Sequence, residues 1–183
     1  MSIQSEQEFK TLLTATQADL LQNSYPFQQA FTQTNRYYDT ADGDLHRQGW
    51  GLRTRQFADH SEQTLKIPAG PHRQLLEYTD PITGLTLAPG GTVAAQLAAA
   101  NIPLNHLQQF AEATTIRRTA PLSAGLLTLD QTQYPNGTTD WEAELEYQDY
   151  PVALAFWQAL QQRFAWSTST PENKVQRAKR NVN

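Results

Sequence analysis

Charged residues occupy every second position in several stretches of this 183-residue chain that have the pattern of β-strands. In the segment SEQEFK, Glu6, Glu8 and Lys10 alternate with Gln7 and Phe9, so the three charges share one face of a strand. The same alternation recurs along the chain at Arg53 and Arg55, Lys66, Glu77, Arg117 or Arg118, Asp130, and Glu142, Glu144 and Glu146. Any one of these strands alone is typical of a sheet that turns its charges to water.

Taken together, the charged rows indicate a shared partner. The carboxylates of Glu142, Glu144 and Glu146 repel one another on a strand face, and neighbouring strands relieve this only in part. Such a row suits a divalent metal, because Mg²⁺ and Mn²⁺ prefer hard carboxylate ligands. Rows of arginine and lysine suit a polyanion such as a phosphate chain. The interleaved rows therefore predict a site for a metal–polyphosphate complex.

Eight segments with strand patterns would carry these rows. They are 3–12, 32–40, 49–57, 61–68, 73–80, 114–122, 125–134 and 140–150. Since their charged faces turn toward a common site, their apolar faces must be buried against helices. This arrangement predicts that Phe9 points outward, beneath a helix, while its charged neighbours point inward.

Helix signals lie between and after the strands. Thr14, followed three residues later by Gln17, predicts a helix N-terminus, and Thr92 is the expected cap of an alanine-rich helix. The expected helices cover 91–102, 105–113 and 151–165, and a short helix or strand is expected over 170–180. With no repeat or linker in view, we expect one α+β domain over 1–183.

Composition excludes several function classes. The net charge is 14 − 18 = −4, which disfavours binding to nucleic acid or to an anionic membrane surface. The absence of cysteine excludes disulfides, thiolate metal sites and a cysteine nucleophile. No stretch has the about 18 apolar residues that a membrane span needs, and the N-terminus has no signal-peptide pattern. We therefore expect a soluble, cytoplasmic protein.

An ordered series of motifs resembles the CYTH superfamily, the triphosphate tunnel metalloenzymes. EQEFK resembles the family's ExExK signature, and the segment from QTNRYYDT to GLRTR resembles its aromatic-aromatic-Asp-Thr and LRxR segments. The later motifs follow in family order as TLKIP, LLEY, TLD, WEAELEY and ENKVQRA. The resemblance covers nearly the whole chain and is nearest to the small, single-domain bacterial branch called YjbK-like.

The resemblance implies a fold and an activity. The implied fold is an eight-stranded antiparallel β-barrel that forms a tunnel with a polar lumen, with helices packed on the outside. The implied activity is divalent-metal-dependent hydrolysis of triphosphate-containing substrates, with Mg²⁺ or Mn²⁺ as cofactor and inorganic triphosphate favoured. Thiamine triphosphate hydrolysis and adenylyl cyclase chemistry on the same site remain alternatives. A non-catalytic polyphosphate- or nucleotide-binding protein is a further alternative, and the oligomeric state stays open between monomer and homodimer.

Family roles carry over residue by residue. The implied metal ligands are Glu6, Glu8, Glu144, Glu146 and Asp130. The implied phosphate-binding residues are Lys10, Arg53, Arg55, Lys66, Arg118 and Lys174, of which Lys10 and Arg55, with Glu8, are the implied catalytic residues. Secondary candidates are Glu77, Glu142, Arg117 and Arg177. The sequence leaves open whether Arg117 or Arg118 points inward, and we prefer Arg118.

One position departs from the family pattern. Leu75 stands two residues before Glu77, where the family often has arginine, and Arg73 or Arg36 would have to compensate. Fewer cations in the tunnel would change the choice of substrate.

Overall fold

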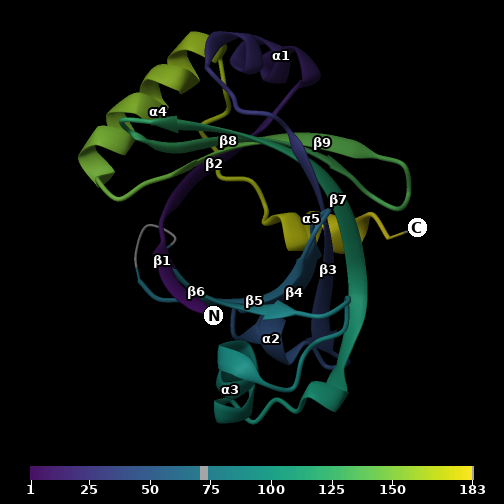
Figure 1. Ribbon diagram of the computed structural model, residues 1–183. Helices are drawn as coiled ribbons and strands as arrows, with labels where there is room; N and C mark the ends of the chain where they lie inside the picture. The colour runs from purple at the N-terminus through teal and green to yellow at the C-terminus, as the bar shows by residue number, and fades with distance from the viewer. Residues whose placement is uncertain (71–73, 183) are drawn as a thin grey trace.

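The protein forms one curled antiparallel sheet. The computed structural model describes residues 1–70 and 74–182. Within them, nine strands form a single sheet that closes into a ring when seen end-on in Figure 1. The strands are β1 (Ser2–Glu6), β2 (Glu8–Leu13), β3 (Phe31–Thr40), β4 (Gly51–Gln56), β5 (Ser61–Pro68), β6 (Leu75–Ile82), β7 (Leu107–Leu122), β8 (Gly125–Gln133) and β9 (Thr139–Glu146). Their order across the sheet is β1-β6-β5-β4-β3-β7-β8-β9-β2.

The N-terminal segment closes the tunnel. The two strands at the ends of the sheet order, β1 and β2, follow each other in the chain with only Gln7 between them. β1 pairs with β6 in one half of the sheet, whereas β2 pairs with β9 in the other half. The strand expected over 3–12 is thus divided at Gln7, which is why nine strands stand where a barrel of eight was predicted.

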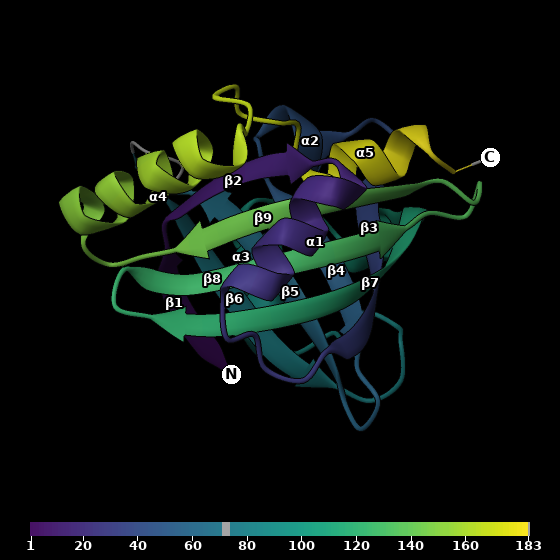
Figure 2. The ribbon, with the colours of Figure 1, turned by 90° about the horizontal axis from the view of Figure 1, so that it is seen from above.

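Two helices cover the outer face of one half of the sheet. These are α1 (Ala15–Ser24) and α4 (Tyr150–Phe164), which lie above β2, β8 and β9 in Figure 1 and are seen from above in Figure 2. Leu21 of α1 and Trp157 of α4 pack in one core with Leu145 of β9. Phe9 stacks on Trp157 with ring centroids 5.9 Å apart, so the prediction that it points outward under a helix is confirmed.

Two shorter helices cover the other half. Here α2 (Asp44–Arg47) and α3 (Gly91–Ala99) bury Leu45 and Leu97 against Leu52 and Leu65 of the sheet. In the described ranges, no helix is both long enough and apolar enough to cross a lipid bilayer.

The remaining helix lies inside the ring. Helix α5 (Lys174–Arg180) packs its Ala178 on Tyr37, Ala111 and Ala113. Tyr37 lines the interior cavity, and Ala111 is its partner on the neighbouring strand, so this contact is on the inner face of the sheet. Figure 1 shows α5 within the opening of the ring.

The helix predicted over 105–113 is wrong. A single 3₁₀ turn, Leu104–His106, leads directly into β7, which is 16 residues long. β7 pairs with β3 from Leu107 to Arg117, and its Ala111 and Ala113 pack in one cluster with Ala178 of α5. This pairing and packing outweigh the helix propensity of the alanine- and glutamine-rich sequence, since tertiary contacts override weak local preferences.

Strand β6 differs at both ends from the strand predicted over 73–80. It begins at Leu75 and continues through Pro81 to Ile82. Arg73, suggested as a compensating cation, lies outside the described residues. Arg36 pairs with Glu112, and neither residue lines the cavity, so Arg36 does not replace the missing cation.

Local capping signals explain α1 and revise the explanation of α3. The Thr14 hydroxyl accepts from the Gln17 N–H, and the Gln17 side chain accepts from the Thr14 N–H, which confirms the predicted capping box. Thr92, however, is not the cap of α3. Instead the carboxylate of Asp80, on β6, accepts from the N–H groups of Thr92 (3.0 Å) and Val93 (2.8 Å).

Replacing Asp80 with alanine should destabilise the fold. Asp80 is buried, and its loss leaves two helix N–H groups without their acceptor, so we expect unfolding free energy to fall by about 1–2 kcal/mol. Thr92→Val, which removes only the hydroxyl that donates to Asp80, should cost clearly less. Thermal denaturation of both variants measures this difference. Equal losses would contradict the assignment of Asp80 as the cap.

Candidate active site

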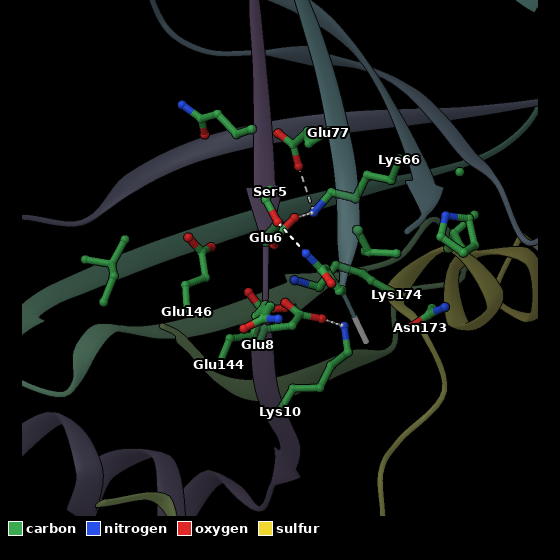
Figure 3. A pocket seen from close by; sticks show the side chains of 18 of the residues that line it. Ser5, Glu6, Glu8, Lys10, Lys66, Glu77, Glu144, Glu146, Asn173 and Lys174 are labelled. Carbon is green, nitrogen blue, oxygen red and sulfur yellow. Dashed lines mark hydrogen bonds and ion pairs between the residues drawn. The ribbon is translucent and has the colours of Figure 1, made fainter. Parts of the chain in front are cut away.

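The curled sheet encloses a cavity of about 1560 Å³ on its inner face. The charged rows predicted from the sequence converge on it, because each strand turns alternate side chains inward. The predicted residues that line the cavity are Glu6, Glu8, Lys10, Arg53, Arg55, Lys66, Glu77, Arg117, Glu144, Glu146 and Lys174. Figure 3 shows how those from β1, β2, β5, β6, β9 and α5 lie around one space.

Four glutamates of β1, β2 and β9 form an acidic wall of the cavity: Glu6, Glu8, Glu144 and Glu146. Glu8 lies opposite Glu146, and Lys10 lies opposite Glu144, in the register of these strands. Burial, together with the negative charges of Glu6 and Glu144, raises the pKa of Glu146 to about 7. Glu146 forms no ion pair with any described residue, whereas Glu8 pairs with Lys10. The wall therefore carries more negative charge than its neighbours balance.

Lys66 links the acidic wall to β6. Its ammonium lies 2.5 Å from Glu6 and 2.9 Å from Glu77, as the dashed lines of Figure 3 show. Burial alone would raise the pKa of Glu77, but the charges of Lys66 and Arg53 hold it well below the usual range. Glu77 is therefore an ionised partner that orients the basic side chains.

A basic cluster made by Arg53, Arg55 and Arg117 faces the same cavity. Burial and the positive charges of Arg53 and Arg117 lower the pKa of Arg55 to about 9. Its nearest carboxylate, on Glu62, is 3.6 Å away, and Asn35 accepts a hydrogen bond from Nε at 2.8 Å. Guanidinium groups that repel one another in this way favour an anionic ligand between them.

A second carboxylate group lies deeper. One oxygen from each of Asp130, Glu142 and Glu144 falls within 4.8 Å of the others. Arg117 bonds Asp130 at 2.7 Å and Glu144 at 2.9 Å, while Lys174 bonds Asp130 at 2.5 Å and lies 3.2 Å from Glu142. Burial opposes the ionisation of Glu144, yet Lys174 and Arg117 keep its pKa well below the usual range. Asp130 and Glu144 are thus already balanced by protein cations, whereas burial raises the pKa of Glu142.

The preference for Arg118 does not hold. Arg117 lines the cavity and pairs with Asp130 and Glu144, whereas Arg118 is not part of the cavity wall. Adjacent residues of a strand point to opposite faces, so only one of the two can point inward. Asp130 is fully buried behind Arg117, and Arg177 binds Asp140 and Glu142 at 2.8 Å each without lining the cavity.

The acidic wall fits a divalent cation. The ligands that Mg²⁺ and Mn²⁺ prefer are hard carboxylate oxygens, and the wall supplies several of them to one cavity. Among the described residues, the three carboxylate oxygens that lie within 4.8 Å of one another belong to Asp130, Glu142 and Glu144, of which only Glu144 lines the cavity. The raised pKa of Glu146 shows negative charge that described protein cations do not balance, which a bound cation would relieve. The residues available for this are Glu6, Glu8, Glu144 and Glu146.

Comparison with known proteins identifies the family. A sequence model of the CYTH domain matches residues 4–177. The chain belongs to the CYTH family. No curated protein sequence matches this CYTH chain, and the YjbK-like branch stays a prediction.

Solved structures share the fold over almost the full chain. A candidate adenylate cyclase from Bacillus halodurans is 28% identical, with a TM-score of 0.86 over 97% of this CYTH chain and 98% of its own. A candidate adenylyl cyclase from Hippeastrum, for which a dominant triphosphatase activity is described, is 18% identical, with a TM-score of 0.78 over 98% and 96%. A protein from Pyrococcus horikoshii, at 12% identity and a TM-score of 0.62 over 97% and 99%, shares the fold alone.

The sequence analysis predicted β3 as a strand but assigned none of its residues to the cavity. Gln33, Asn35 and Tyr37 of β3 line the cavity between the arginines of β4 and Arg117 of β7. Their alternation is visible in the predicted strand over 32–40, but they carry no charge. A search for charged rows therefore passed over them.

Glu146 in the acidic wall should make the stability of the metal-free protein fall as pH rises. A carboxyl whose folded pKa is about 7, against an unfolded value near 4.5, binds a proton in the folded state between these values, so stability declines across that window. With EDTA present, the melting temperature should drop from pH 5 to pH 7.5. Glu146→Gln should reduce this slope and melt higher than the parent protein at pH 7.5. Parallel pH profiles for the two proteins would contradict the raised pKa.

Proposed function

We propose that this CYTH chain is a divalent-metal-dependent hydrolase of triphosphate-containing substrates, with inorganic triphosphate favoured. The supporting observation is that one cavity has an acidic and a basic wall whose charges protein partners balance only in part. The pKa of Glu146 is raised to about 7, and that of Arg55 is lowered to about 9 although Glu62 lies 3.6 Å away. A metal–triphosphate complex brings a cation to the first wall and an anion to the second.

The residues that line the cavity would have three roles: binding the metal, binding the phosphates and positioning other side chains. Glu6, Glu8, Glu144 and Glu146 would hold Mg²⁺ or Mn²⁺, which when bound supplies charge neutralisation and an activated water. Arg53, Arg55 and Arg117 would bind the phosphate oxygens and stabilise charge that moves onto the leaving oxygen. Lys10 and Lys66, which pair with Glu8 and Glu6, line the same cavity and would also contact phosphate oxygens. Lys174 and Asp130 would position Arg117.

The domain and setting follow the same proposal. We treat 1–183 as a single domain that acts in the cytoplasm on a small molecule, without nucleic acid or membrane as partner, because its net charge of −4 offers little attraction to polyanionic surfaces. Leu75, which lines the cavity in place of the family arginine, leaves a less basic tunnel. A short substrate with a high charge density, such as inorganic triphosphate, can contact most of the remaining cations at once.

A phosphate-release panel tests the activity. Inorganic triphosphate, thiamine triphosphate and ATP are each incubated with Mg²⁺, with Mn²⁺ and with EDTA, and products are analysed. We expect metal-dependent release, fastest from inorganic triphosphate. Cyclic AMP from ATP would favour the adenylyl cyclase alternative, which the Bacillus halodurans neighbour keeps in view. Binding without turnover of any of the three would favour a non-catalytic protein.

Glu8→Gln should abolish the metal-dependent activity and keep the fold. The substitution preserves shape but removes a buried charge from the acidic wall, so we expect phosphate release to fall by about 100-fold or more, with weaker Mn²⁺ binding. A matched control is Glu112→Gln, which removes a carboxylate from an ion pair with Arg36 away from the cavity. An unchanged rate in folded Glu8→Gln would remove Glu8 from the site.

A further inference from the structure

Gln33 stands out among the neutral residues of the cavity. It lines the cavity near the start of β3, and only 2% of its surface is exposed. Its amide makes no hydrogen bond to any described residue, and the oxygen Oε1 is fully buried. A buried amide without a partner costs free energy, roughly 1–3 kcal/mol in proteins, and therefore calls for an explanation.

Gln63 shows how this protein treats a buried glutamine elsewhere. It is fully buried on β5, yet its side chain accepts from the N–H of Ala88 at 2.8 Å and donates to the carbonyls of Ala88 and Gly90 at 3.4 Å. Gln63 is absent from the cavity wall. Gln63, which lies outside the cavity, therefore uses its amide in hydrogen bonds to the backbone, whereas the amide of Gln33, which lines the cavity, has no such partner among the described residues.

The position of Gln33 explains what its amide can meet. β3 lies between β4 and β7 in the sheet. On β3, Asn35 lies opposite Arg55 of β4 and Phe31 lies opposite Arg117 of β7, so Gln33 is two residues from each of these paired positions. The arginines are close enough for the charge of Arg117 to help lower the pKa of Arg55. Arg117 already directs Nε and one terminal nitrogen to Asp130 and Glu144, so its other terminal nitrogen and the guanidinium of Arg55 are the groups that an anion beside Gln33 would meet.

We propose that the amide of Gln33 binds a phosphate group held between Arg55 and Arg117. This inference rests on the proposed function for the identity of the anion. The amide NH₂ donates to a phosphate oxygen, and the amide oxygen can accept from a protonated phosphate or a water bound to it. A neutral donor suits this place, because a third cation would add to the repulsion that Arg55 already experiences.

Gln33→Leu and Gln63→Leu form a matched pair for the test. Both replace a buried glutamine with a side chain of similar size. Melting temperatures are measured without ligand, and binding of the non-hydrolysable imido analogue of triphosphate, and of orthophosphate, is measured by calorimetry in EDTA. We expect Gln33→Leu to melt higher than the parent protein and to bind the analogue at least about tenfold more weakly. Gln63→Leu should melt lower, because it loses made hydrogen bonds, and should bind with unchanged affinity.

Other outcomes separate this inference from the proposed function. If folded Gln33→Leu binds the analogue as tightly as the parent protein, the inference is wrong even when the parent hydrolyses triphosphate. If the parent binds the analogue, Gln33→Leu binds it weakly and no substrate of the panel is turned over, the inference stands and the proposed hydrolase fails. Gln33→Glu adds a check that does not depend on leucine packing, because a carboxylate at this place should repel the analogue more strongly than leucine does.

Discussion

Burying many ionised side chains in one enclosed space is the constraint on which this structure depends. An isolated charge is costly to remove from water, so each must find a partner of opposite sign or a ligand. Most do: Lys66 lies between two glutamates, and Asp130 lies between Arg117 and Lys174. The charges that protein partners compensate least are those of Glu146 on one side and of Arg55, 3.6 Å from Glu62, on the other. These incompletely compensated charges, rather than the whole set of charged residues, determine which ligand the cavity can bind.

The N-terminal segment gives the cavity its continuity. Because β1 pairs with β6 and β2 pairs with β9, Glu6 belongs to one half of the sheet while Glu8 and Lys10 belong to the other. Glu6 contacts Lys66 of β5, and Lys10 lies opposite Glu144 of β9. The strand pairings that close the ring therefore also bring the glutamates of the acidic wall together. A metal held at this wall would also hold the two halves of the sheet together.

The alternation of charges made the rows and their direction predictable, because a strand has only two faces and the apolar one had to be buried. Other features depend on partners far away in sequence. The cap of α3 comes from Asp80 on another element, and residues 105–113 extend because β3 runs beside them. The choice of Arg117 over Arg118 needed the register with Asp130, which no local pattern contains. Gln33, Asn35 and Tyr37 of β3 could not be recognised from charge alternation, because they carry no charge.

The place of α5 in chain order has a consequence for synthesis on the ribosome. The described strands that form the ring all precede α5, so they leave the exit tunnel before Lys174 and Arg177 do. Until those two side chains arrive, Asp130 and Glu142 lack cations that they bond in the finished protein. The nascent ring therefore lacks these two compensating cations until α5 packs on its inner face. The strands are translated before the helix whose cations compensate their carboxylates. This order favours closure of the sheet before α5 packs inside it.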